Sequence, residues 1–194
     1  MSWKPVITLL AVCLLFSGCK HFTSASYSGP LADFAKKIDP VYSKYVSIYS
    51  QEKEARQKGD VQKVMSLDMQ GEATRKPLKD AIDEAMKTEK GKEIPFTQTG
   101  SQDKYTVTKI AFIGAFENRG AGDVYTIFQA DAIVKSPEER WKTETWKFVN
   151  KKGEVFAEVK FTNTSGAKSG PVNFSGEYVK LGDIDKNLDR ILIP

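Results

Sequence analysis

The chain has 194 residues and a nearly balanced charge, with 29 Lys and Arg against 25 Asp and Glu. No segment gathers basic residues into the stripe that is typical of nucleic-acid binders, so we expect no nucleic-acid partner. The one histidine, His21, lies near the start of the chain, which excludes Ser-His-Asp, Cys-His and histidine-rich zinc sites from the domain that follows. The two cysteines, Cys13 and Cys19, also precede that domain, so we expect no disulfide in it.

The first eighteen residues have the three zones of a signal peptide. Lys4 supplies a positive start, residues 6–16 form an uninterrupted apolar run, and Ser17 and Gly18 are small residues in front of Cys19. The run is too short for a transmembrane helix, which needs about 20 apolar residues. Residues 1–18 are therefore predicted to be a targeting segment that is removed.

The segment Leu15-Phe16-Ser17-Gly18-Cys19 resembles the lipobox of bacterial lipoproteins, although the family usually has Leu where Phe16 stands. The resemblance implies that Cys19 is the lipid attachment site, with palmitate or similar acyl chains, and that the protein is held to a membrane of the cell envelope. Two or more acyl chains anchor a protein stably. Lys20, in place of the Asp that retains such proteins in the inner membrane, favours the outer membrane, facing the periplasm or the surface. An ordinary secretory leader followed by a coincidental cysteine is the alternative.

Residues 19–30 are predicted to be a flexible tether, because the segment after Cys19 is small and polar. Residues 31–194 then form one predicted domain, helical over 31–91 and β-rich over 92–194. This length is sufficient for a sizeable hydrophobic core.

The helical part begins with a capping signal. Asp39-Pro40 is a capping residue followed by proline at the first helical position, and Gly59-Asp60 ends that helix and caps a second. One face of the first helix is expected to carry Val41, Tyr45, Ile48, Glu52 and Ala55.

The second helix has two residues that disfavour an unbroken helix, Gly71 and Pro77. A buried stripe follows them, made of Leu78, Ala81, Ile82, Ala85 and Met86. We therefore expect a helical hairpin with a bend or break near Pro77.

From Ile94 onward the apolar period changes from 3.6 residues to 2, which indicates strands. The expected strands are 105–116, 124–134, 142–150, 154–162 and 172–178, followed by an apolar tail with Leu188, Ile191 and Ile193. The fold class is therefore predicted to be α+β, an N-terminal helical hairpin packed on an antiparallel sheet of five or six strands.

This order of elements, with a Lys58-Gly59-Asp60 helix junction before long strands, is loosely similar to envelope lipoproteins of the nuclear-transport-factor-2-like class. The resemblance implies a curved sheet wrapped around a helix-lined pocket.

Asp131 is the best candidate for a catalytic acid, because it lies within the apolar run 128–133. A buried carboxylate without a partner is costly and often functional. The alternative is a half-solvated sheet face, shared by Tyr125, Ile127, Gln129 and Ile133. We expect no second carboxylate beside Asp131 and no catalytic residue.

A weak metal candidate is the set Asp183, Asp185, Asn187 and Asp189, whose oxygens alternate as in calcium loops. Leu188 stands where such a loop needs glycine, and the distal glutamate is missing. A polar turn is therefore favoured, and we expect neither a metal nor a cofactor. The Gly120-Ala121-Gly122 segment lacks the spacing of a phosphate-binding loop.

Trp141 and Trp146 are separated by an odd number of residues, so an unbroken strand would point them to opposite faces. One is expected in the core and the other at the surface. An exposed Trp would suit a glycan or peptide surface.

Three function classes remain. The first is a noncatalytic ligand-binding module whose ligand-binding residues the sequence does not identify, with a small ligand or an envelope protein as its partner. The alternative is a protein-interaction lipoprotein of the assembly or immunity type. A carboxylate-dependent hydrolase is the third.

Overall fold

The computed structural model describes residues 27–136, 141–167, 169–184 and 187–194. The predicted signal peptide, Cys19 and His21 lie outside these ranges. Within them, no helix has the length and apolar character needed to cross a membrane.

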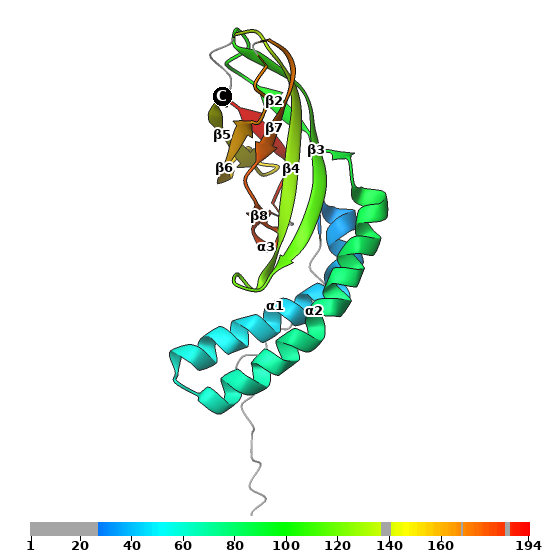
Figure 1. Cartoon of the computed structure of the whole chain (residues 1–194), viewed down its shortest axis with the longest axis vertical. Coiled ribbons are helices and arrows are strands. Elements are labelled where there is room, and N and C mark those ends of the chain that lie inside the picture. The colour runs from blue at the N-terminus through cyan, green and yellow to red at the C-terminus, as the bar shows by residue number, and fades with distance from the viewer. Residues whose placement is uncertain (1–26, 137–140, 168, 185–186) are drawn as a thin grey trace, which may run out of the picture.

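Two long helices precede a sheet, and a short helix interrupts the final strands (Figure 1). The elements are α1 (Ala32–Gln57), α2 (Val61–Glu89), β1 (Lys92–Glu93), β2 (Phe96–Gln98), β3 (Tyr105–Asn118), β4 (Asp123–Val134), β5 (Thr143–Val149), β6 (Val155–Asn163), β7 (Gly170–Gly176), β8 (Val179–Lys180), α3 (Leu181–Ile184) and β9 (Arg190–Ile193). The predicted α+β class with an N-terminal helical hairpin is confirmed. The predicted number of strands is too low, because the sheet has nine.

The sheet is mostly antiparallel and curled. Its strand order is β1-β3-β4-β7-β6-β5-β9-β2, with β8 paired to β4, and among the described strands only the β2–β9 pair is parallel. The side chain of Gln98, on β2, donates to the carbonyl of Tyr105 at 3.0 Å and accepts from the amide of Val107 at 3.0 Å, both on β3. These bonds join β2, at one end of the path, to β3, near the other end, and hold the sheet in its curl.

Aromatic side chains fill the core, both under the helical hairpin and within the curl of the sheet. Phe34 of α1 meets Phe112 of β3 edge-on, with ring centroids 4.9 Å apart. Trp146 stacks on Phe161 at 4.1 Å, and both side chains are fully buried. The region in which the resemblance places a ligand pocket is thus occupied by the protein's own core.

Helix α1 begins at Ala32, so the prediction that Asp39-Pro40 starts it is wrong. The preceding turns are helical because Phe34 and Ile38 continue the buried stripe of the helix at three- and four-residue spacing, and both are 0% exposed. Asp39 instead accepts hydrogen bonds from the hydroxyls of Tyr27 and Ser43. Packing of the apolar face outweighs the capping signal.

Helix α2 is continuous from Val61 to Glu89, so of the predicted bend or break near Pro77 the break is wrong. The predicted cap is confirmed, since Asp60 accepts from the amide of Lys63 at 3.0 Å. Both helices curve between the sheet and the far end of the hairpin, which extends below the turn between β3 and β4 (Figure 1).

Residues 27–30 are attached to the domain, which shortens the tether predicted over 19–30. The hydroxyl of Tyr27 donates to Asp39, and the amide of Ala32 donates to the carbonyl of Gly29 at 3.2 Å. Gly29 has a φ of +89°, and a Cβ there would lie 2.1 Å from the carbonyl oxygen of Leu188. Residues 27–30 are therefore held against the rest of the described domain.

Candidate functional site

A cleft of about 760 Å³ lies between α1 and the turn that joins β3 to β4. Its walls come from residues 46–56 of α1 and residues 119–123 of the turn, and Lys180 of β8 also lines it. We call this space the turn cleft.

The turn approaches the helices closely because two glycines leave room for Tyr49. A Cβ on Gly71 of α2 would lie 3.2 Å from the end of the Tyr49 ring, and a Cβ on Gly122 would lie 2.6 Å from the Cβ of Tyr49. The ring of Tyr49 also packs on Tyr45, with centroids 4.6 Å apart. The side chain of Tyr49 is thus held between both helices and the turn.

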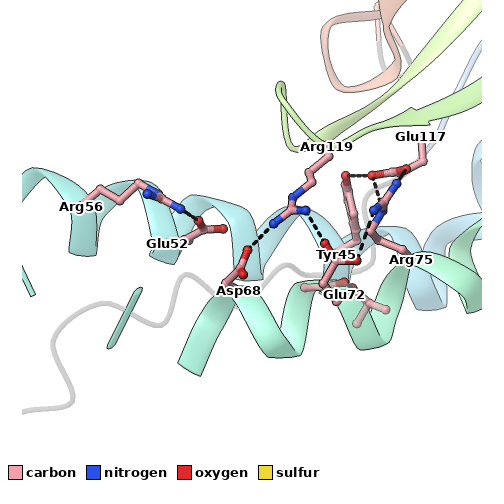
Figure 2. Close-up of polar contacts among 10 residues, drawn as sticks. Tyr45, Glu52, Arg56, Asp68, Glu72, Arg75, Glu117 and Arg119 are labelled. Atoms are coloured by element: carbon pink, nitrogen blue, oxygen red, sulfur yellow. Dashed lines mark hydrogen bonds and ion pairs between the residues drawn. The ribbon is translucent and has the colours of Figure 1, made fainter. Parts of the chain in front are cut away.

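Charged side chains join the turn to α2 (Figure 2). Arg119, in the turn, contacts Asp68 at 2.5 Å and Glu72 at 2.6 Å. Arg75 contacts Glu72 and Glu117, each at 3.2 Å, and Glu117 accepts from the hydroxyl of Tyr45 at 2.6 Å. We call this group of residues the turn network.

The turn network holds each of its charges opposite a partner. Hydrogen bonds that the guanidinium groups donate to the carboxylates raise the pKa of Arg75 and of Arg119, so both stay cationic. Burial, reinforced by the hydrogen bond to Glu117, raises the pKa of Tyr45 far above its usual range. Burial also raises the pKa of Tyr49. The network therefore fixes the turn to the helices through paired charges.

Asp123 lies in the turn cleft and is partly withdrawn from solvent. It accepts from the hydroxyl of Tyr42 at 2.7 Å and from the amide of Val124 at 2.7 Å. Burial raises the pKa of Asp123, and these hydrogen bonds oppose that rise. Its carboxylate is thus engaged by groups of the protein itself.

The turn cleft is positively charged. Four cationic side chains line it, against two carboxylates, and Arg56 pairs with Glu52 at 2.5 Å. Among the described residues, neither Lys53 nor Lys180 has an ion-pair partner. These two lysines are the groups in the cleft that remain available to an anionic ligand.

Asp131, the candidate acid, lies on the half-exposed outer face of β4. In the pairing of β4 with its neighbours, Lys109 of β3 and Asn173 of β7 stand opposite it. The amide nitrogen of Asn173 donates to Asp131 Oδ1 at 3.0 Å when it faces the carboxylate. Asp131 therefore lies on a half-solvated sheet face, which is the alternative given in the sequence analysis.

The calcium candidate is only partly described, because Asp185 lies outside the described residues. Asp183 belongs to α3, the amide of Asn187 donates to the carbonyl of Ile184 at 3.3 Å, and Asp189 pairs with Arg190 at 2.8 Å. Within the described ranges, no group of three or more His, Cys, Asp or Glu is arranged to hold a metal ion. The described part of this segment has the hydrogen bonds of a turn.

Trp146 is fully buried and Trp141 is 61% exposed, so the expectation of one core and one surface Trp is confirmed. The predicted reason, that the two residues lie on opposite faces of one strand, does not apply. Strand β5 begins only at Thr143, and Trp141 precedes it with a φ of +57°.

The sequence analysis did not identify Lys53, Lys180 or Arg119 as site residues. The turn lies between the expected strands 105–116 and 124–134, but isolated lysines on a helix and at a strand end have no pattern that marks a shared cleft. Only the docking of the turn on α1 brings them together.

No protein-family model matches the chain, and no curated protein matches it significantly. A solved structure described as the X-ray structure of Northeast Structural Genomics Consortium target SoR45 is 14% identical, with a TM-score of 0.24. The match covers 41% of this chain and 66% of that one, which is under two thirds of its length.

Proposed function

We propose that this protein is a lipid-anchored lipoprotein of the cell envelope that binds an acidic segment of a partner protein, without catalysis, in the turn cleft. The observation that carries the proposal is the pair of unpartnered lysines, Lys53 and Lys180, in a cleft whose other charges are largely paired.

The shape and charge of the cleft support this choice of ligand. Core side chains fill the interior enclosed by the helices and the curled sheet, so we place the ligand in a cleft at the surface. An open, positively charged cleft suits an extended acidic peptide, because several carboxylates can reach the lysines without being buried. Exposed ion pairs contribute about 0.2–1 kcal/mol each and weaken with added salt. We therefore expect weak, salt-sensitive binding.

The anchor would keep the cleft close to the membrane. Tyr27 is fixed to Asp39, and seven residues lie between Cys19 and Tyr27. The eight Cα–Cα steps from Cys19 to Tyr27 span at most about 29 Å. A partner in the same membrane or at its surface would then be within reach of the turn cleft.

Replacing Cys19 with Ala is expected to move the protein from the membrane fraction to the soluble fraction, because the thioether that would carry the lipid is lost. Fractionation of cells expressing either form measures this, with mass spectrometry of the mature N-terminus. A wild-type N-terminus that is unmodified, or that starts elsewhere than Cys19, would contradict the anchor without bearing on the cleft.

The double variant Lys53→Gln/Lys180→Gln is expected to bind a pentaglutamate peptide about tenfold more weakly than the wild type, since two ion pairs are lost. Fluorescence anisotropy with a labelled peptide at low salt measures the affinity. Lys79→Gln is the matched control, because Lys79 is an exposed α2 lysine outside the cleft. Equal affinity in the double variant and in this control would exclude the turn cleft as the binding site.

A second candidate function, an interaction of the assembly or immunity type, is favoured by one surface feature. Val61, Met65 and Met69 recur every four residues on α2, and their side chains are 68%, 63% and 69% exposed. Methionine-rich helix faces suit adaptable protein contacts.

A further inference from the structure

A second cleft, of about 620 Å³, lies beside β4, β6, β8 and α3. Its lining joins aromatic rings to carboxylates, namely Tyr125, Phe156 and Tyr178 with Glu158, Glu177 and Asp183. Lys180 lines this cleft as well as the turn cleft. We call it the aromatic cleft.

The aromatic rings form an ordered group. Phe116 stacks on Tyr125 with centroids 5.8 Å apart and planes 18° apart, and it meets Tyr178 edge-on at 5.0 Å. Tyr178 is 61% exposed although its neighbours hold its ring in place. A large ring that is fixed but uncovered is available to a ligand.

The carboxylates give the aromatic cleft a charge opposite to that of the turn cleft. Three acidic side chains line it against one lysine. Within the described part of the chain, Glu158 and Asp183 have no ion pair, and Glu177 has only a contact with Lys160 at 3.9 Å between exposed groups. A ligand that enters this cleft therefore meets uncompensated negative charge.

We propose that the aromatic cleft binds an organic cation, an alkylammonium group held by the carboxylates and by the faces of the tyrosine rings. Aromatic faces attract cations through the ring quadrupole, and carboxylates add ion pairs and hydrogen-bond acceptors. The same chemistry is offered by a free polyamine and by a lysine side chain of another protein. This site is separate from the turn cleft in charge and in its aromatic lining, so either proposal can fail alone.

The test is calorimetric titration of the full-length protein in a nonionic detergent, with spermidine in one arm and a pentalysine peptide in the other. Glu158→Gln/Asp183→Asn is expected to weaken binding of the preferred probe about tenfold, and Tyr178→Ala about fivefold. The arm with the higher affinity identifies the source of the cation.

Two controls match these variants. Asp103→Asn removes an exposed carboxylate near the other end of the β3–β4 hairpin, and Trp141→Ala removes a ring that is equally exposed but outside the cleft. Both are expected to bind as the wild type does. Thermal unfolding of every variant shows whether a loss of binding reflects a loss of fold; in that case Tyr178→Phe, which keeps the ring, is expected to bind normally.

Lys180 lines both clefts, so its replacement should change the two binding affinities in opposite directions. Lys180→Gln is expected to weaken pentaglutamate binding in the turn cleft and to strengthen cation binding in the aromatic cleft, each severalfold. Loss of both activities, binding of neither cation by the wild type, or Tyr178-dependent binding of chitotriose instead would overturn the proposal.

Discussion

Glu117→Ala is expected to lower the free energy of unfolding by about 3 kcal/mol. The carboxylate of Glu117 is 10% exposed and accepts the hydroxyl of Tyr45, a residue that is 0% exposed. Without it, the Tyr45 hydroxyl is buried with no acceptor, and Arg75 keeps only Glu72. Urea unfolding followed by circular dichroism measures the change.

Glu72→Ala is the matched control for Glu117→Ala. Glu72 belongs to the same network and contacts both Arg75 and Arg119, but its side chain is 43% exposed. Exposed pairs contribute little, so the loss should be under about 1 kcal/mol. Glu117→Gln, which keeps an acceptor for Tyr45, should fall between the two. Equal losses in Glu72→Ala and Glu117→Ala would show that burial of the Tyr45 hydroxyl does not determine how much the turn network contributes to stability.

The long strands were predictable because both are long apolar runs rich in β-forming residues, and β4 in addition has one buried and one half-exposed face. The expected strands 105–116 and 124–134 correspond to β3 (Tyr105–Asn118) and β4 (Asp123–Val134), where residues of β4 alternate between buried and partly buried along its length. Period-two alternation follows directly from strand geometry. The residues of such a strand are therefore sufficient to predict it, without knowledge of its neighbours in the fold.

The short strands and the helix boundaries were not predictable in the same way. β1, β2 and β8 have two or three residues each, too few for an alternating pattern to be recognised. Asp39-Pro40 has the sequence of a capping pair, yet α1 begins at Ala32, eight residues before Pro40, because Phe34 reaches Phe112 of β3. A contact between residues so far apart in the chain outweighs a local signal, and only the fold reveals it.

Neither candidate cleft could be predicted from the sequence, because the fold brings together residues that are far apart in the chain. The sequence pattern placed Tyr125 on one face with Asp131, but nothing in it brought Tyr125 and Tyr178 together with Glu158 and Asp183. Those four residues meet because β8 pairs with β4 and α3 follows β8 directly. The turn cleft likewise depends on the approach of residues 119–123 to α1, which two glycines permit.

Gly122→Ala is expected to lower the free energy of unfolding by about 3 kcal/mol, for two independent reasons. Gly122 has a φ of +60°, which is unfavourable for a residue with a Cβ. The added Cβ would also lie 2.6 Å from the Cβ of Tyr49, so the turn or α1 must shift. The affected atom belongs to the start of the side chain, so rotation of the Tyr49 ring cannot relieve the contact.

Gly120→Ala, in the same turn, is the control. Its Cβ would meet only the side-chain oxygen of Asn118, at 3.4 Å, which is an ordinary contact, and a change of under about 0.5 kcal/mol is expected. Both variants are measured by urea unfolding and by pentaglutamate binding. Because the shift in Gly122→Ala separates the turn from α1, its affinity should fall as well, while that of Gly120→Ala should not. A Gly122→Ala protein with wild-type stability would mean that the turn does not pack on Tyr49, and the turn cleft would then lose its wall.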